Sequence, residues 1–257
     1  MNHIAATKLP LEAFFEMSKR LGITEVEIRN DIPDVVGTMP AEEVKALADK
    51  HGITILSINA LYPFNVWLGD LPDRAVAMAD YAAACGAQAL VMCPLNDGNE
   101  VSFGDLVTAL KEMKPILDAR GLKGLLEPLG FPSSSMRKKA TAIEAIKAAG
   151  GEGTYKLMHD TFHHHLASET DFFPEWTGLV HISGVTNPSV AVDDMLDAHR
   201  VLVDADDRLK NLPQIKALLE LGYTGPFSFE PFAEEVHSLS DPEAALAISI
   251  DHVKSAL

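Results

Sequence analysis

The sequence predicts a (β/α)₈ barrel, an α/β fold in which eight parallel strands alternate with helices. Eight short apolar or alternating segments are separated by helical patterns or long loops, which favours a parallel sheet. The chain has 257 residues, close to the ~250 that such a barrel takes. No Gly-x-Gly-x-x-Gly pattern follows an early strand, which weakens the competing open, doubly wound sheet. No linker or low-complexity tract divides the chain, so residues 1–257 are interpreted as one domain.

The predicted strands are short and mostly apolar. The first is expected at His3–Thr7, and charged and apolar residues alternate in the second, Glu25–Arg29. The others are continuous apolar or β-branched runs, as strands buried on both faces of a parallel sheet should be. They are expected at Ile53–Asn59, Ala89–Pro94, Leu122–Glu127, Tyr155–His159, Leu179–Ser183 and Pro226–Glu230.

Helices are predicted where apolar residues recur at helical spacing. Pro10 opens the first one, Leu11–Leu21, and Gly22 ends it. Further helices are expected at Met39–His51, Pro72–Cys85, Leu106–Ala119, Ala140–Ala149, Leu212–Leu221 and Ala244–Val253, with a short one starting near His164. The segment Asn187–Asp207 is long, acidic and without clear periodicity, so we interpret it as an excursion over one face of the barrel, of the kind that forms lids.

The composition is that of an ordinary globular protein with a strongly acidic surface. Hydrophobic residues make up 47% and charged residues 23%, and the formal net charge is -16. Such a charge repels phosphate backbones and anionic lipids, so neither nucleic acid nor a membrane is an expected partner. A homo-oligomer is compatible with this composition.

The cysteines and the N-terminus indicate a cytoplasmic protein. Cys85 and Cys93 are the two cysteines, and both lie in apolar surroundings. Buried thiols in a reducing cytosol are therefore expected rather than a disulfide framework. The N-terminus has no basic segment followed by an apolar core, and no apolar run approaches the ~20 residues needed to cross a bilayer.

Four segments each place one acid or histidine at the end of an apolar run. These residues are Glu127, Asp160, His181 and Glu230. The carboxyl ends of barrel strands face a common mouth, where such folds hold their chemistry. Carboxylates and a neutral imidazole are suitable ligands for a divalent metal. The sequence therefore predicts one metal site built from the ends of the fifth to eighth strands.

Other residues are weaker candidates for the same pocket. His163 and His165 follow Asp160 in a histidine-rich stretch, and Asn59 ends an early strand, so all three are candidates for contact with a substrate. Tyr62, Phe64 and Trp67 are interpreted as pocket wall or core. Each candidate also has a structural alternative. The histidine-rich stretch is compatible with a solvated loop, and each glutamate is compatible with an ordinary ion pair. His181 is compatible with a core position in which it bonds to a backbone carbonyl.

Most of the chain resembles the xylose isomerase-like TIM barrel family, which contains sugar epimerases, inosose dehydratase and hydroxypyruvate isomerase. Within it the chain is most similar to the inosose isomerases (2-keto-myo-inositol isomerases). The resemblance rests on Glu27-Ile-Arg29, Ile58-Asn-Ala-Leu61, Pro94-Leu95, Leu126-Glu-Pro-Leu-Gly-Phe-Pro132, Asp160-Thr-Phe-His-His-His165, His181-Ile182, Arg200-Val201 and Ser228-Phe-Glu-Pro-Phe232.

The resemblance implies roles for individual residues. It implies that Glu127, Asp160, His181 and Glu230 bind one divalent ion, either zinc, manganese or magnesium, and that His163 and Arg200 contact substrate oxygens. Two departures lie beside the substrate position. Ser183-Gly184 stands where relatives often have an acidic pair, and Leu202–Asp207 stands where a glycine-rich turn often follows the arginine. Arg200 also fits a surface ion pair in an acidic loop.

These residues favour an isomerase or epimerase acting on a small polyhydroxy ketone, such as a keto sugar or an inosose. Removing a proton next to a carbonyl gives an enediolate, whose charge a divalent ion can stabilise as a Lewis acid. Glu127 and Glu230 would take the proton and return it. Within the family the alternatives are an inosose-type dehydratase or a hydroxypyruvate isomerase. More remote alternatives are a nuclease of the endonuclease IV type, which the acidic charge disfavours, and a metal- or sugar-binding barrel without catalysis.

Overall fold

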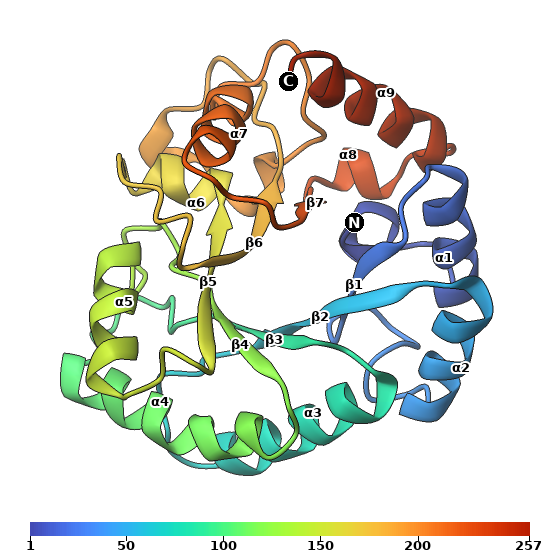
Figure 1. Cartoon of the computed structure of the whole chain (residues 1–257). Helices are drawn as coiled ribbons and strands as arrows, with labels where there is room; N and C mark the ends of the chain where they lie inside the picture. Colours follow the sequence, from blue (N-terminus) through green and yellow to red (C-terminus); the bar gives the residue numbers. More distant parts are fainter.

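Seven parallel strands form one sheet that curves into an almost closed barrel, with helices around the outside (Figure 1). The structure is a computed structural model that describes residues 1–257. The strands follow chain order, and each pairs in parallel with the next, which confirms the predicted barrel class. They are β1 (Glu25–Arg29), β2 (Thr54–Leu61), β3 (Ala89–Met92), β4 (Lys123–Leu126), β5 (Tyr155–Asp160), β6 (Thr177–Ile182) and β7 (Phe227–Phe229).

Helices follow every strand of the barrel. They are α1 (Leu11–Arg20), α2 (Ala41–His51), α3 (Leu71–Cys85), α4 (Phe103–Asp118), α5 (Lys139–Ala148), α6 (Thr161–Leu166), α7 (Asn211–Glu220), α8 (Glu234–His237) and α9 (Pro242–Ser255). Gly52 and Gly86 end α2 and α3 in the left-handed conformation, with φ of 62° and 80°, where any other residue would be strained. The predicted helices agree with these bounds within a few residues, whereas the short α8 was not predicted.

The barrel closes through Asn2 rather than through the predicted first strand. Asn2 forms a single parallel bridge with Glu27 of β1, and its backbone N–H donates to the carbonyl of Phe229 in β7 at 3.2 Å. Figure 1 shows the N-terminus between these two strands. Residues His3–Ala6 then form a 3₁₀ helix, because the Asn2 side chain accepts from the N–H of Ile4. The expected strand His3–Thr7 is thus wrong: a short apolar run does not distinguish strand from helix.

Alternation along β1 places polar groups inside the barrel. Val26 and Ile28 belong to the main apolar core, while Glu27 and Arg29 contact polar side chains from other strands. All four residues are buried. Side chains of a strand point alternately to its two faces. Val26 and Ile28 therefore face the packed layer beneath the helices, and Glu27 and Arg29 face the polar barrel mouth.

The predicted excursion lies between β6 and α7. It contains two short 3₁₀ helices, Val192–Asp194 and Asp197–His199, and returns to the barrel where Gly184 and Val201 form an antiparallel bridge. The bridge delivers Arg200 to the barrel mouth, where the residue is only 1% exposed. No helix in the chain has the length and apolar character needed to cross a membrane.

Gly130, between β4 and α5, lies directly against α6. A Cβ at this position would lie 2.2 Å from the carbonyl oxygen of His163 and 2.8 Å from the Cβ of Leu166. We expect Gly130→Ala to cost about 1–3 kcal/mol of unfolding free energy, because backbone must move to make room. Gly153→Ala is the control, since nothing lies within 4 Å of its Cβ position. Denaturant unfolding should separate the two variants, and equal stabilities would contradict this packing.

Candidate metal and substrate site

Four side chains converge at the carboxyl ends of the last four strands. Glu127 follows β4, Asp160 ends β5, His181 lies in β6 and Glu230 follows β7. One ligand atom from each residue lies within 4.8 Å of those of the other three, and all four residues are buried. The Nδ1 of His181 is 2.9 Å from Glu230 Oε2, 3.3 Å from Glu127 Oε1 and 3.9 Å from Asp160 Oδ2. The structure therefore brings together the four residues that the strand ends singled out.

Asp160 presents one oxygen to this centre because its other oxygen caps a helix. Its Oδ1 accepts from the backbone N–H groups of Phe162 and His163, at 2.7 and 3.3 Å, which is the ordinary N-cap arrangement for α6. Its Oδ2 is left facing His181 and Arg200. Because α6 begins directly after β5, the helix that Asp160 caps also fixes the position of its carboxylate.

His181 is oriented by Glu27, a residue to which the sequence analysis assigned no role in the site. The Nε2 of His181 lies 3.0 Å from Glu27 Oε1, so its Nδ1 is turned toward the three carboxylates. Glu27 also accepts from Ser57 Oγ at 2.6 Å and from Asn59 Nδ2 at 2.9 Å. A histidine that donates its second N–H to a carboxylate is the usual arrangement around protein-bound metals. Asn59 lines the pocket as expected, but its amide is engaged with Glu27.

Glu230 is held from both sides by guanidinium groups. Its Oε1 accepts from Arg29 Nη1 at 2.8 Å and from Asn2 Nδ2 at 3.2 Å. Its Oε2 accepts from Arg200 Nη2 at 3.0 Å. Arg200 also bonds to Asp160 Oδ2 at 2.6 Å, so it is part of the buried site rather than a surface ion pair.

Glu127 has a weaker set of partners. Its Oε1 faces His181, and its Oε2 accepts from the thiol of Cys93 at 3.2 Å. Burial and the neighbouring Glu127 raise the pKa of Cys93 well above its usual value, so the thiol stays protonated and donates. The two glutamates of the site therefore differ: charged donors fix Glu230, whereas a neutral thiol holds Glu127.

Glu230 and His181 strongly shift each other's pKa. Burial alone would raise the pKa of Glu230, but the charges of His181, Arg200 and Arg29 lower it to about 2. Burial alone would lower the pKa of His181, but Glu230 and Glu27 raise it well above its usual value. Three carboxylates thus concentrate negative charge around one imidazole nitrogen.

The donor set suits a divalent cation. Three carboxylate oxygens and one imidazole nitrogen converge, and each residue has its other polar atom fixed by a protein donor or acceptor. Hard divalent ions prefer carboxylate oxygens, and imidazole is accepted by zinc and by manganese-like ions. The residues present therefore fit a bound divalent metal, without choosing among these ions.

The contact between Glu27 and His181 gives a direct test of this arrangement. We expect Glu27→Gln to weaken the binding of Mn²⁺ or Zn²⁺ by about 10–100-fold, the usual effect of losing such an orienting carboxylate. The control is Glu25→Gln on the same strand, because Glu25 is exposed and lies outside the site. Calorimetric metal titrations of both variants provide the measurement. Unchanged affinity in Glu27→Gln would show that His181 needs no such support.

A cavity of about 460 Å³ opens above the four side chains. It is lined by Arg29, Asn30, Asp31, Asn59, Ala60, Tyr62, Arg74, Cys93, Asn96, Glu127, Leu129, Phe131, His163, Asp197, Arg200, Glu230 and Phe232. The ring of His163 packs edge-on against Phe131 and Phe162, and its Nδ1 has no partner in the protein. The pocket thus contains both residues that the resemblance implied for substrate contact, His163 and Arg200.

His165 requires a correction. It lines a separate pocket between α6 and α7, together with Lys210 and Phe172, and not the cavity above the ligands. Neighbours on an α-helix point in directions about 100° apart, so residues two positions apart on α6 face different surroundings. The structure places His163 at the mouth and His165 outside it.

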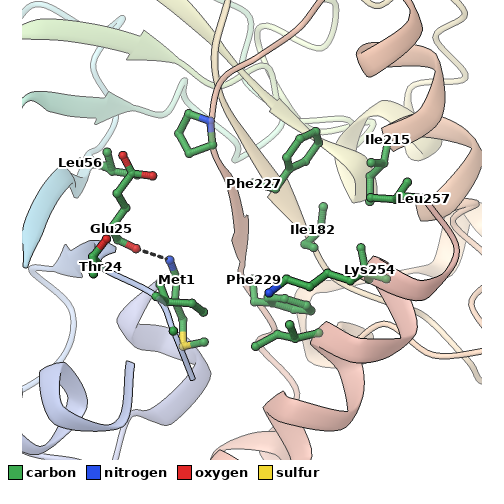
Figure 2. A pocket seen from close by; sticks show the side chains of 15 residues that line it. Met1, Thr24, Glu25, Leu56, Ile182, Ile215, Phe227, Phe229, Lys254 and Leu257 are labelled. Carbon is green, nitrogen blue, oxygen red and sulfur yellow. Dashed lines mark hydrogen bonds between the residues drawn. The ribbon is translucent and has the colours of Figure 1, made fainter. Parts of the chain in front are cut away.

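Another cavity, of about 350 Å³, lies at the opposite end of the barrel, where the strands begin (Figure 2). Figure 2 shows its mostly apolar lining, with Phe227 and Phe229 of β7 on the same side as Ile182, and with Leu56 and Glu25 on the other side. Glu25 and Lys254 carry the only charged side chains among its lining residues. It contains none of the four converging residues, so the chemistry-bearing groups of the barrel lie at the other end.

Comparison with known proteins agrees with this architecture. A family model described as "Xylose isomerase-like TIM barrel" matches residues 15–256. The chain belongs to this family. That membership confirms the resemblance drawn from the sequence motifs, and it covers the strands that carry the converging residues.

Three relatives illustrate the similarity. Inosose isomerase of Halalkalibacterium halodurans is 26% identical over 246 residues, which cover 89% of this chain and 85% of that protein. The structure of a xylose isomerase domain containing protein from Salmonella typhimurium LT2 is 36% identical, with a TM-score of 0.93 over 99% of this chain and 95% of the other. The IOLI protein, solved with a bound zinc atom, shares the fold at 21% identity, with a TM-score of 0.87 over 100% and 98% of the two chains.

Proposed function

We propose that this protein is a divalent-metal-dependent isomerase or epimerase of a small keto sugar or inosose. The observation that carries the proposal is the convergence of Glu127, Asp160, His181 and Glu230 below a polar cavity. The similarity to inosose isomerase supports the reaction class, and the zinc atom bound by the IOLI protein supports a metal-dependent reaction.

A bound divalent ion would polarise the substrate carbonyl as a Lewis acid, with Glu127, Asp160, His181 and Glu230 holding it. The protein itself supplies the proton transfer. Glu127 and Glu230 come from β4 and β7, the two ends of the arc of ligands. One carboxylate would take the proton from the carbon beside the carbonyl, and one would return a proton to give the product.

Two further residues would stabilise charge on the substrate. His163 lines the cavity, so its imidazole can hydrogen-bond to a substrate oxygen. Arg200 contributes a fixed positive charge that is already anchored to Asp160, Glu230 and Ser183. Preorganised donors of this kind act most strongly in a buried site from which water is largely excluded.

Hydrogen exchange into candidate substrates tests the proposal. Protein loaded with Mn²⁺ or Zn²⁺ is incubated in heavy water with a panel of ketoses, inososes, sugar phosphates and sugar acids, and mass spectrometry measures deuterium at carbon. We expect exchange with at least one compound and none with the Glu127→Gln variant. Product analysis then separates isomerisation and epimerisation from dehydration. If no compound of the panel exchanged, the proposed chemistry would be refuted.

A further inference from the structure

The cavity has a second half, across the mouth from the metal ligands. The inner half contains the buried residues Glu127, His163, Arg200 and Glu230. The outer half includes Tyr62, Arg74 and Asn96, which come from the ends of β2 and β3 and from the start of α3. Tyr62 is 41% exposed, and the side chain of Arg74 is 44% exposed. A substrate bound at the ligands would therefore leave this rim free for another part of the same molecule.

Arg74 is the one cation of the cavity without a close carboxylate partner. Arg29 is paired with Asp31 and Glu230 at 2.7 and 2.8 Å, and Arg200 is held by acids in the same way. Arg74, in contrast, donates Nη2 to the backbone carbonyl of Tyr62 at 2.8 Å. Its nearest acid is the exposed Asp70, at 3.8 Å. A guanidinium carries five N–H donors, so most of those on Arg74 remain available.

The two neighbours of Arg74 on the rim also offer donors. The phenol oxygen of Tyr62 accepts from the backbone N–H of Asn96 at 3.3 Å, which leaves the phenol proton free to donate. The side-chain carbonyl of Asn96 accepts from Ser133 at 2.7 Å, and its amide nitrogen has no partner in the protein. Two acids also line the cavity, Asp31 and Asp197; both are about half exposed, and each is paired with a buried arginine. The side of the cavity around Arg74 therefore presents hydrogen-bond donors and one positive charge.

We propose that the substrate carries an anionic oxygen group, a carboxylate or a phosphate, at the end remote from its reacting carbonyl, and that Arg74, Tyr62 and Asn96 bind it. This inference rests on the proposed function, since it concerns the same cavity. A planar guanidinium recognises carboxylate and phosphate oxygens through paired charge-assisted hydrogen bonds. A neutral polyol cannot form such charge-assisted pairs with Arg74, so the anionic substrate is preferred.

The test compares three substrates of one carbon skeleton: a ketohexose, its terminal carboxylic acid and its terminal phosphate. Exchange kinetics in heavy water and calorimetric binding are measured for the wild-type protein, Arg74→Gln and Arg74→Lys. We expect the wild-type protein to favour one anion over the neutral sugar by about tenfold or more, the usual effect of one charged hydrogen bond. Arg74→Gln should lose that preference through KM, with the neutral sugar changed less than about twofold, and Arg74→Lys should recover part of it. Which anion is favoured distinguishes carboxylate from phosphate.

The control is Arg20→Gln, because Arg20 is a surface arginine paired with Glu243 outside the cavity. Equal use of neutral and anionic sugars by the wild-type protein would overturn the inference. So would an Arg74→Gln variant that weakened all three substrates equally, since that is the effect of a structural role. If no sugar exchanged at all, the proposed function would fail, and calorimetric binding would still decide whether Arg74 selects anions.

Discussion

The Glu127→Gln variant is expected to lose about 10²–10⁴-fold in kcat for the proposed isomerisation, the usual contribution of a positioned acid or base. Glutamine keeps the shape of the side chain and its contact with Cys93, but it cannot accept the proton. Because Glu127 contacts the thiol of Cys93 and the ring of His181 but no arginine, the change removes fewer charged contacts than a change at Glu230 would. Deuterium exchange into the substrate should be lost, while the unfolding free energy should fall by less than in the Glu230 variant.

The Glu230→Gln variant is expected to lose turnover and stability together. Glu230 neutralises two buried guanidinium groups, those of Arg29 and Arg200. Removing one partner of a buried ion pair costs about 3–5 kcal/mol, since the other charge is left uncompensated. Denaturant unfolding of the two variants is the discriminating measurement. Similar stabilities would show that the partners of the two glutamates are equivalent, contrary to the geometry.

The candidate ligands could be predicted because a strand end is a local signal. Each of Glu127, Asp160, His181 and Glu230 closes a short apolar run, and the barrel topology alone brings such ends together. Their partners carry no such signal. Glu27 and Arg29 belong to a motif of the family resemblance and to the charged half of an alternating strand, but no role could be assigned to them, because local periodicity does not indicate that this half faces the barrel interior. Their role depends on contacts across more than 150 residues of sequence separation.

The directions of His163 and His165 and the path of the excursion also could not be predicted from the sequence. Asp160 caps α6, so the helix begins at Thr161, earlier than predicted. Because successive residues of a helix point in different directions, His163 faces the cavity and His165 does not. The excursion looked like a lid in the sequence, yet its bridge to Gly184 seats Arg200 in the buried site. Both outcomes depend on a helix start or a tertiary bridge that local periodicity does not encode.

Removal of the metal is expected to abolish exchange without unfolding the protein. A chelator should stop deuterium incorporation, and added Mn²⁺ or Zn²⁺ should restore it. The fold should persist because Arg29 and Arg200 partly neutralise two of the three carboxylates, Asp160 and Glu230, in the absence of an ion. Metal at about 100 times its dissociation constant should then add about 2.7 kcal/mol to the unfolding free energy. Exchange that survived exhaustive chelation would contradict a metal-dependent reaction.

The pH dependence of metal binding should follow from His181. Without metal, Glu230 and Glu27 outweigh burial and raise the pKa of His181 well above its usual value, so the ring is protonated at neutral pH. Its Nδ1 must lose a proton to become a ligand, so binding releases about one proton and the apparent affinity falls by about tenfold per pH unit below that pKa. Above the pKa the affinity should level off. Calorimetric titrations in two buffers of different ionisation enthalpy measure the released proton. Binding without proton release at pH 7 would show that Nδ1 of His181 is not the ligand atom, because three carboxylates cannot surround that nitrogen without either a proton or a metal on it.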